Sequence, residues 1–158
     1  MAADNIDPTS RRILQILAAD GRASYQAIAD AVGLSRPAVM ERVKRLEETG
    51  YILGYSARLD RSKIGYPVTA FIAVRYPTNL SGNDTSVKSL ADNPSVLECH
   101  HVAGEDCYVL KVAAPSLVEL ERIIRQLRGP DEPVSTRTTI VLSSVFEKSG
   151  IVPAGEES

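Results

Sequence analysis

Four basic side chains crowd into one short stretch of a 158-residue chain whose formal net charge is only −2. They are Arg36, Arg42, Lys44 and Arg45. Guanidinium and ammonium groups bind phosphate oxygens, and an arginine can also donate two hydrogen bonds to the edge of a guanine base. The cluster therefore indicates contact with a nucleic acid. An ordinary three-helix bundle with a solvated basic face is the alternative.

The basic cluster belongs to the part of the chain that is positive overall. Residues 1–65 hold 10 Lys or Arg against 8 Asp or Glu, whereas residues 66–158 hold 8 Lys or Arg against 12 Asp or Glu. The difference is small, but its sign agrees with a basic part that binds nucleic acid, joined to an acidic partner module.

Three short helices are expected to position the basic residues. Each has a residue suited to an N-cap at its start and a glycine at its end, and Pro8 suits the first position of the first helix. These caps and glycines are, in chain order, Asp7 and Gly21, Ser24 and Gly33, and Ser35 and Gly50. Two helices joined by a Gly-Leu-Ser turn, after a longer first helix, predict a helix-turn-helix.

On the third helix, a turn of about 100° per residue separates a buried side from a reading side. Val39, Val43 and Leu46 form the buried side. A recognition helix enters the major groove with its N-terminal residues on base edges. The residues predicted to contact bases are Arg36, Pro37, Ala38, Glu41 and Arg45.

Flanking positions are predicted to contact phosphate instead. Arg42 and Lys44 suit this role, although Arg42 lies at the edge of the buried side, where a structural ion pair is an equal alternative. Ser24 and Gln26 begin the second helix, where the N-terminus attracts anions; a purely capping role is the alternative for Ser24. Ser35, the cap of the third helix, completes the predicted DNA-binding set.

From Tyr66 onward the pattern becomes strand, helix, strand, strand, helix, strand, which predicts a ferredoxin-like βαββαβ unit. The expected strands are 68–76, 95–104, 106–114 and 135–146, and the expected helices are 83–93 and 116–129. Their inward residues are Val68, Ala70, Ile72 and Val74 on the first strand, Val87, Leu90 and Ala91 on the first helix, and Leu117, Leu120, Ile123, Ile124 and Leu127 on the second.

A hairpin is expected at Gly104–Glu105, as a type II′ turn that pairs Val102 with Cys107 and Cys99 with Leu110. Residues 51–60 read as a further strand-like segment. The fold class is therefore α+β. The expected divisions are 1–53 (helix-turn-helix), 54–66 (linker strand and hinge), 67–150 (sensing and oligomerisation) and 151–158 (tail).

Other chemistry finds little support. Cys99, His100, His101 and Cys107 look like metal ligands, but neighbours on a strand point to opposite faces, which leaves too few ligands for zinc. No P-loop, G-x-S-x-G or H-E-x-x-H motif is present, so we expect no enzyme activity and no cofactor. No segment resembles a membrane span or a signal peptide, and two cysteines fit a reducing cytoplasm.

Three stretches in order, RVKRLEETGYILGYSARLD, ECHHVAGEDCYVLKV and TRTTIVL, resemble the signatures of the Lrp/AsnC (feast/famine) family of transcription regulators. The resemblance runs from about Ile6 to Phe146. It implies a winged-helix-like DNA-binding domain and a C-terminal RAM/ACT-like domain that senses amino acids. It also implies a homodimer, with dimers often assembling into an octameric ring.

In this resemblance, the effector binds between dimers near one hairpin. The matching residues are Val102, Ala103, Gly104, Glu105, Asp106 and Cys107, with Thr136 and Thr138 on the last strand as further candidates. The chain departs from the family at Cys107, where many members carry an acid. Asp106 is one residue earlier, on the opposite face of a strand, so it does not simply inherit that role.

The sequence thus predicts a regulator that binds double-stranded DNA at specific sites and responds to an amino acid or a related metabolite. A low-specificity, effector-independent chromatin organiser of the same fold is the alternative. An enzyme of amino-acid metabolism, or its regulatory subunit, is a third class. The basic helix at residues 35–49 argues against that class.

Overall fold

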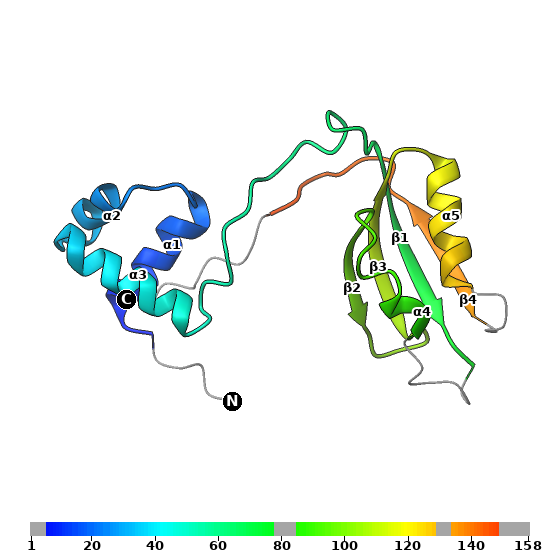
Figure 1. Cartoon of the computed structure of the whole chain (residues 1–158), viewed down its shortest axis with the longest axis horizontal. Coiled ribbons are helices and arrows are strands. Elements are labelled where there is room, and N and C mark those ends of the chain that lie inside the picture. Colours follow the sequence, from blue (N-terminus) through cyan, green and yellow to red (C-terminus); the bar gives the residue numbers. More distant parts are fainter. Residues whose placement is uncertain (1–5, 78–84, 129–133, 149–158) are drawn as a thin grey trace. The chain divides into compact units, whose positions relative to one another are not determined.

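The computed structural model describes residues 6–77, 85–128 and 134–148, and the chain divides into two compact units (Figure 1). The first unit comprises the described residues up to Arg58 together with those from Phe146 onward, and the second comprises Leu59–Val145. The domain limits at 53/54 and 66/67 stay predictions, and the tail at 151–158 lies outside the described residues. No helix in the described ranges is long and apolar enough to cross a membrane.

The first unit is a bundle of three helices, α1 (Pro8–Ala19), α2 (Tyr25–Val32) and α3 (Arg36–Glu48). Asp7, Ser24 and Ser35 are the N-caps, as predicted, and each side chain accepts a hydrogen bond from the backbone N–H three residues ahead. The core consists of Ile13, Leu14, Ile28, Ala29, Val39, Val43 and Leu46. These residues come from all three helices, so burial of their apolar faces holds the bundle together.

Helix α1 ends at Ala19 with Asp20 as its C-cap, and Gly21 follows that cap directly, as Gly50 follows the C-cap Thr49 of α3. One expectation for this unit was wrong. Residues 51–60 form no strand, because their backbone has no neighbouring strand with which to pair within the described chain. Local β-propensity alone does not form a strand without a hydrogen-bonding partner.

The second unit is one antiparallel sheet with its helices on one face (Figure 1). Its elements are β1 (Val68–Arg75), α4 (Thr85–Lys88), β2 (Val96–His101), β3 (Tyr108–Ala114), α5 (Leu117–Leu127) and β4 (Ser135–Ile140). The strand order is β2-β3-β1-β4, with every neighbouring pair antiparallel. This order is the predicted ferredoxin-like arrangement, in which each helix connects strands that are not neighbours in the sheet.

Alternation along the strands divides the second unit into a core and an open sheet face. Ala70, Ile72 and Val74 of β1 are fully buried in the core with Leu120, Ile123 and Leu127 of α5. On the opposite face, Phe71 is 42% exposed and pairs with Lys111. The predicted inward stripes were wrong at Ala91 and Leu117, which are exposed. Strand β4 also ends at Ile140, well before the expected end, and residues 83–84 of the expected first helix lie outside the described chain.

The hairpin between β2 and β3 has the predicted register. Cys99 pairs with Leu110, and the backbone N–H of Val102 donates to the carbonyl of Cys107 at 3.0 Å. Gly104 has a φ of 135°, which an L side chain rarely adopts. The hairpin is therefore fixed by its glycine and by the alternation of the strands on either side.

Candidate nucleic-acid interface and ligand hairpin

One side of helix α3 packs into the core of the three-helix bundle, and the opposite side is exposed to solvent. Val39 and Val43 are fully buried and Leu46 is nearly so, as the helical wheel predicts. Around the rest of the helix, Arg36, Pro37, Glu41, Lys44 and Arg45 are exposed, and Ala38 and Arg42 are half-buried. The predicted reading residues thus share one accessible surface at the start and middle of α3.

The four cations of this helix differ in their partners. Arg36 and Arg45 have no side-chain hydrogen bond or ion pair within the described chain. Lys44 makes a long contact of 3.6 Å to Glu48, with both side chains largely exposed. Exposed pairs of this kind contribute little. Arg36 and Arg45 are therefore free to donate to another molecule, and Lys44 is nearly so.

Arg42 has a structural partner. Its Nη1 lies 3.0 Å from both carboxylate oxygens of Asp7 and donates to the Ser10 hydroxyl oxygen at 3.1 Å. Asp7 is the N-cap of α1, so this contact ties α3 to the first turn of α1. The Arg42 side chain remains 39% exposed. Arg42 thus forms the structural ion pair that was one of its two predicted roles. Its contact with phosphate stays a prediction.

The same contacts affect the ionisation of Asp7. The Ser10 hydroxyl donates to one of its oxygens at 2.6 Å, and the Ser10 backbone N–H donates to the other at 3.1 Å. These bonds, led by the hydroxyl and aided by the positive charge of Arg42, hold the pKa of Asp7 below its usual value, although burial acts in the opposite direction. Asp7 is therefore both a cap and an ion-pair partner.

The turn between α2 and α3 sets the position of the reading helix. Gly33 ends α2 with a φ of 69°, and the next backbone N–H, of Leu34, donates to Ala29 at 3.1 Å. Ser24 caps α2 and remains exposed, while the Gln26 amide donates to Asp30 at 2.8 Å. Gln26 is thus held along its own helix. The phosphate roles of Ser24, Gln26 and Ser35 stay predictions.

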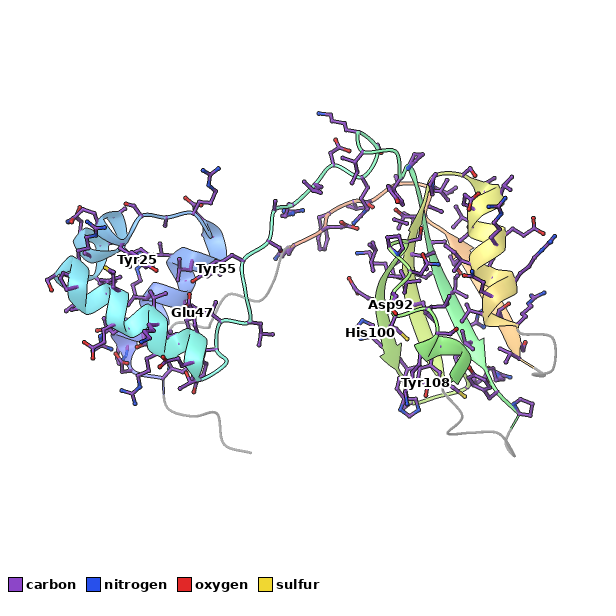
Figure 2. All side chains as sticks on the ribbon, viewed as in Figure 1. Tyr25, Glu47, Tyr55, Asp92, His100 and Tyr108 are labelled. Atoms are coloured by element: carbon purple, nitrogen blue, oxygen red, sulfur yellow. The ribbon has the colours of Figure 1, made fainter. Side chains whose placement is uncertain are left out.

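Tyr55, which was not among the predicted site residues, joins the segment after α3 to the helical bundle. Figure 2 labels Tyr55 and its partner on α3, Glu47. The Tyr55 hydroxyl donates to Glu47 Oε1 at 3.0 Å, and its ring packs at Gly21, where an added methyl group would lie 3.6 Å away. Burial, with the hydrogen bond to Glu47, raises the pKa of Tyr55 to about 12.

The predicted effector hairpin carries two ion pairs to the sheet. Arg75 at the end of β1 contacts Glu105 at 2.7 Å, and Arg137 of β4 contacts Asp106 at 2.8 Å. Neither arginine was predicted as a site residue. Arg137 alternates with Thr136 and Thr138 in the last strand, and this alternation was the available signal.

The two threonines face the other side of the sheet from Arg137. Thr136 and Thr138 lie opposite Val74 and Ile72, which belong to the core beneath α5. Thr136 Oγ1 accepts from Arg128 Nε at 3.0 Å and from Nη2 at 2.9 Å. The structure therefore brings Arg137, rather than either threonine, to the carboxylate of the hairpin.

Cys107 turns toward the core, away from Arg137. It packs against the hydrophobic cluster beside Tyr108, which Figure 2 labels at this end of the sheet. The Tyr108 ring lies 6.1 Å from that of Tyr76 and 5.0 Å from that of His101. Asp106, by contrast, points to the opposite side and keeps an ionic partner. The predicted opposition of Asp106 and Cys107 agrees with these contacts.

Comparison with known proteins identifies both units. Residues 6–52 match the winged helix-turn-helix DNA-binding model, and residues 69–151 match the Lrp/AsnC ligand binding domain. The HTH-type transcriptional regulator LrpA of Mycobacterium tuberculosis is 38% identical over 152 residues, covering 96% of this chain and 98% of that protein. A proline dehydrogenase transcriptional activator of Rhizobium radiobacter is 32% identical, covering 94% and 96%.

A solved structure agrees with these matches. The feast or famine regulatory protein from M. tuberculosis, complexed with L-methionine, has a TM-score of 0.84 at 35% identity and covers 94% of this chain and 99% of its own. The relatives are transcription regulators, and both of their functional units are present here. The chain belongs to the Lrp/AsnC family of transcription regulators.

Proposed function

We propose that this regulator reads specific DNA sites with α3 and that an amino acid modulates its activity. The observation that carries the first part is the pair of arginines, Arg36 and Arg45, exposed on the reading side of α3 without a protein partner in the described chain. An unpaired guanidinium loses no internal hydrogen bond when it binds guanine or phosphate.

In this proposal, Arg36 and Arg45 contact base edges, with Pro37, Ala38 and Glu41 completing the surface that faces the major groove. Lys44 contacts phosphate. The N-termini of α2 and α3, with Ser24, Gln26 and Ser35, lie on neighbouring phosphates, where the partial positive charge of a helix start is favourable. The main role of Arg42 is its ion pair with Asp7, which holds α3 against α1, and its contact with phosphate is secondary.

The test is DNA binding by Arg36→Ala and Arg45→Ala, with sites first obtained by selection from random duplexes. Each substitution should lose about 1–3 kcal/mol of discrimination, roughly 5- to 150-fold, between the selected site and a site changed at one base. The matched control is Arg122→Ala, an exposed arginine of α5 that pairs with Glu119 at 3.1 Å and should leave DNA binding unchanged.

Unchanged discrimination in Arg45→Ala would contradict the assigned docking of α3. Footprinting of the wild-type protein separates the two kinds of DNA binder. Short discrete sites agree with a specific regulator, whereas long periodic protection over unrelated sequences would favour a chromatin organiser instead.

The effector is proposed to be an amino acid bound at the hairpin of residues 102–107. Support comes from the ligand-binding domain at residues 69–151 and from the relative whose structure contains L-methionine. A ligand that binds only the folded state raises the melting temperature, and the stabilisation grows with the logarithm of the ligand concentration divided by its dissociation constant. A thermal-shift screen of the twenty amino acids should therefore give at least one dose-dependent shift, and none at millimolar concentration would contradict an amino-acid effector.

The proposed assembly is a homodimer whose dimers associate further, up to an octamer, with the effector at an interface between subunits. Two-fold symmetry would place two copies of α3 on half-sites about one helical turn, or a multiple of it, apart. Several subunits would also sum their phosphate contacts, which suits a chain of such modest basicity. Light scattering after size exclusion, with and without the effector found in the screen, tests the assembly.

A further inference from the structure

We propose that Met40 contacts the C5 methyl group of a thymine in the major groove and so adds an apolar specificity contact to the arginine contacts of α3. This inference rests on the proposed function and names a residue, absent from the predicted reading set, that selects one base. It starts from the exposure of Met40, which is 44% accessible although its helix supplies three side chains to the core.

Met40 lies among the cations of the proposed reading surface. Arg36 precedes it by four positions and Lys44 follows it by four, so the three side chains share one stripe along the helix. Pro37, three positions before Met40, is exposed beside this stripe. Met40 is thus the apolar centre of a surface whose neighbouring cations are proposed to contact a base and a phosphate.

The fold does not use the Met40 side chain. Within the described residues, Met40 belongs neither to the core cluster of the helical bundle nor to the partly buried side chains that pack against it. A single exposed apolar residue is ordinary on a protein surface, so exposure alone indicates nothing. The position of Met40 is what points to a ligand, because it lies between two cations on a surface that the proposed function requires to stay open for DNA.

Thymine presents the matching chemical group. Its C5 methyl is an apolar group on the major-groove edge of a base pair, and contact with an apolar side chain distinguishes thymine from cytosine. Methionine is unbranched and carries a polarisable thioether, so its end can adjust to the position of a methyl group.

The spacing along α3 predicts where this thymine lies. One helical turn, about 5.4 Å, separates Met40 from Arg36, and successive bases of a strand are about 3.4 Å apart. The thymine is therefore expected within about two base pairs of the base that Arg36 contacts.

The experiment uses the full-length protein and the duplex obtained by selection from random sequences. Each thymine of that duplex is replaced in turn by deoxyuridine, which removes the C5 methyl and keeps the hydrogen-bonding groups of the base. Burial of one methyl-sized group corresponds to about a fourfold change in affinity. At one or more thymine positions, the wild type should therefore bind the deoxyuridine duplex about three- to fivefold more weakly.

Met40→Ala should bind the thymine duplex about three- to fivefold more weakly than the wild type does, and its affinities for the thymine and deoxyuridine duplexes should agree within about twofold. These four affinities form a double-mutant cycle whose partners are the side chain and the methyl group. Lys44→Ala, the matched control on the same stripe, should weaken both duplexes alike and keep their ratio. Val118→Ala truncates a side chain of α5 that is 61% exposed and should change neither affinity.

Circular dichroism of each free variant reports folding. If Met40→Ala does not fold, Met40→Gln keeps the length of the side chain but gives it a polar end. It should lose the response to deoxyuridine in the same way, because the amide gains nothing from contact with a methyl group.

Two failures are distinguishable. If selection yields no preferred sequence, specific DNA binding by α3 is wrong, and this inference falls with it. If a preferred site is obtained but none of its positions responds to deoxyuridine, only the role of Met40 is overturned. The same holds if the response persists unchanged in Met40→Ala, or in Met40→Gln in its place, because the methyl contact then belongs to another apolar residue of the surface, such as Ala38.

Discussion

Replacing Asp7 by alanine should destabilise the first unit more than any other single change to its surface charges, because Asp7 has two structural roles. Its carboxylate caps α1 through Ser10, and it also pairs with Arg42 of α3 across 35 positions of sequence. Asparagine at position 7 keeps an oxygen for the cap but has no charge. Arg42→Gln removes the ion pair and leaves the cap intact.

The magnitudes follow from these contacts. Loss of an aspartate N-cap to alanine costs about 1 kcal/mol. The Arg42–Asp7 pair is 39% and 49% exposed, so solvent screening limits it to about 0.2–1 kcal/mol. We therefore expect Asp7→Ala to lower the free energy of unfolding of this unit by about 1–2 kcal/mol. Asp7→Asn and Arg42→Gln should each lower it by about 0.5 kcal/mol.

Hydrogen exchange measured by mass spectrometry suits this comparison. The chain has two compact units, so a single melting curve would mix their transitions. Exchange in peptides that cover α1 and α3 reports the opening free energy of the first unit alone, and peptides from β1 and β3 serve as the internal control. A double variant, Asp7→Asn with Arg42→Gln, gives the coupling between the two side chains.

One combination of results would refute this account of Arg42. It is unchanged exchange in Arg42→Gln together with a large loss of DNA affinity and a shallower dependence of that affinity on salt. Arg42 would then be a phosphate contact whose pairing with Asp7 contributes nothing measurable. A coupling free energy near zero would also exclude the pair as a tie between α1 and α3.

Three further predictions follow from the same unit. The pKa of Asp7 is lowered on folding, so its stabilising effect is fully present above the unfolded value, about 4, and is lost as pH falls through the folded value. Hydrogen exchange in α1 should therefore favour wild type over Asp7→Asn at pH 7, and the difference should shrink as the pH falls below about 4. Tyr55 should ionise near pH 12 in an ultraviolet titration, and Glu47→Gln should lower that value, whereas Tyr55→Phe should simply remove the late step. Gly33→Ala should lower the free energy of unfolding by about 1–2 kcal/mol, because φ at this position is 69°, although no neighbouring atom would clash with the added methyl group. Hydrogen exchange in α2 measures this loss, and Gly33→Asn should lose less.

Local rules explain what the sequence could predict. The caps at Ser24 and Ser35 and the turn at Gly33 depend on neighbours within four residues, and each was placed correctly. The hairpin register followed from one glycine and from alternation. The order of strands and helices along the chain was enough to predict the sheet, because βαββαβ has few ways to form a single antiparallel layer.

The errors occurred where a residue needs a partner that local pattern does not specify. Residues 51–60 have the composition of a strand, but no strand lies beside them in the described part of the chain. Leu117 fits the apolar stripe of α5, but it occupies the first position of the helix, where the side chain leans toward the N-terminus and away from the core. Ala91 follows a helix of only four residues, too short to maintain a stripe.

The same reason explains what was missed at the two candidate sites. Arg42 and Arg137 are tied to Asp7 and Asp106 by contacts over 35 and 31 positions of sequence. From composition, either arginine could be free to bind a ligand or committed to the fold. Exposure distinguishes them only in part, at 39% for Arg42 and 71% for Arg137. Arg137 is the more exposed of the two, and the Asp106 carboxylate with which it pairs caps no helix. Arg42 shares its carboxylate with a helix cap, so a ligand that displaced it would also have to disrupt the start of α1.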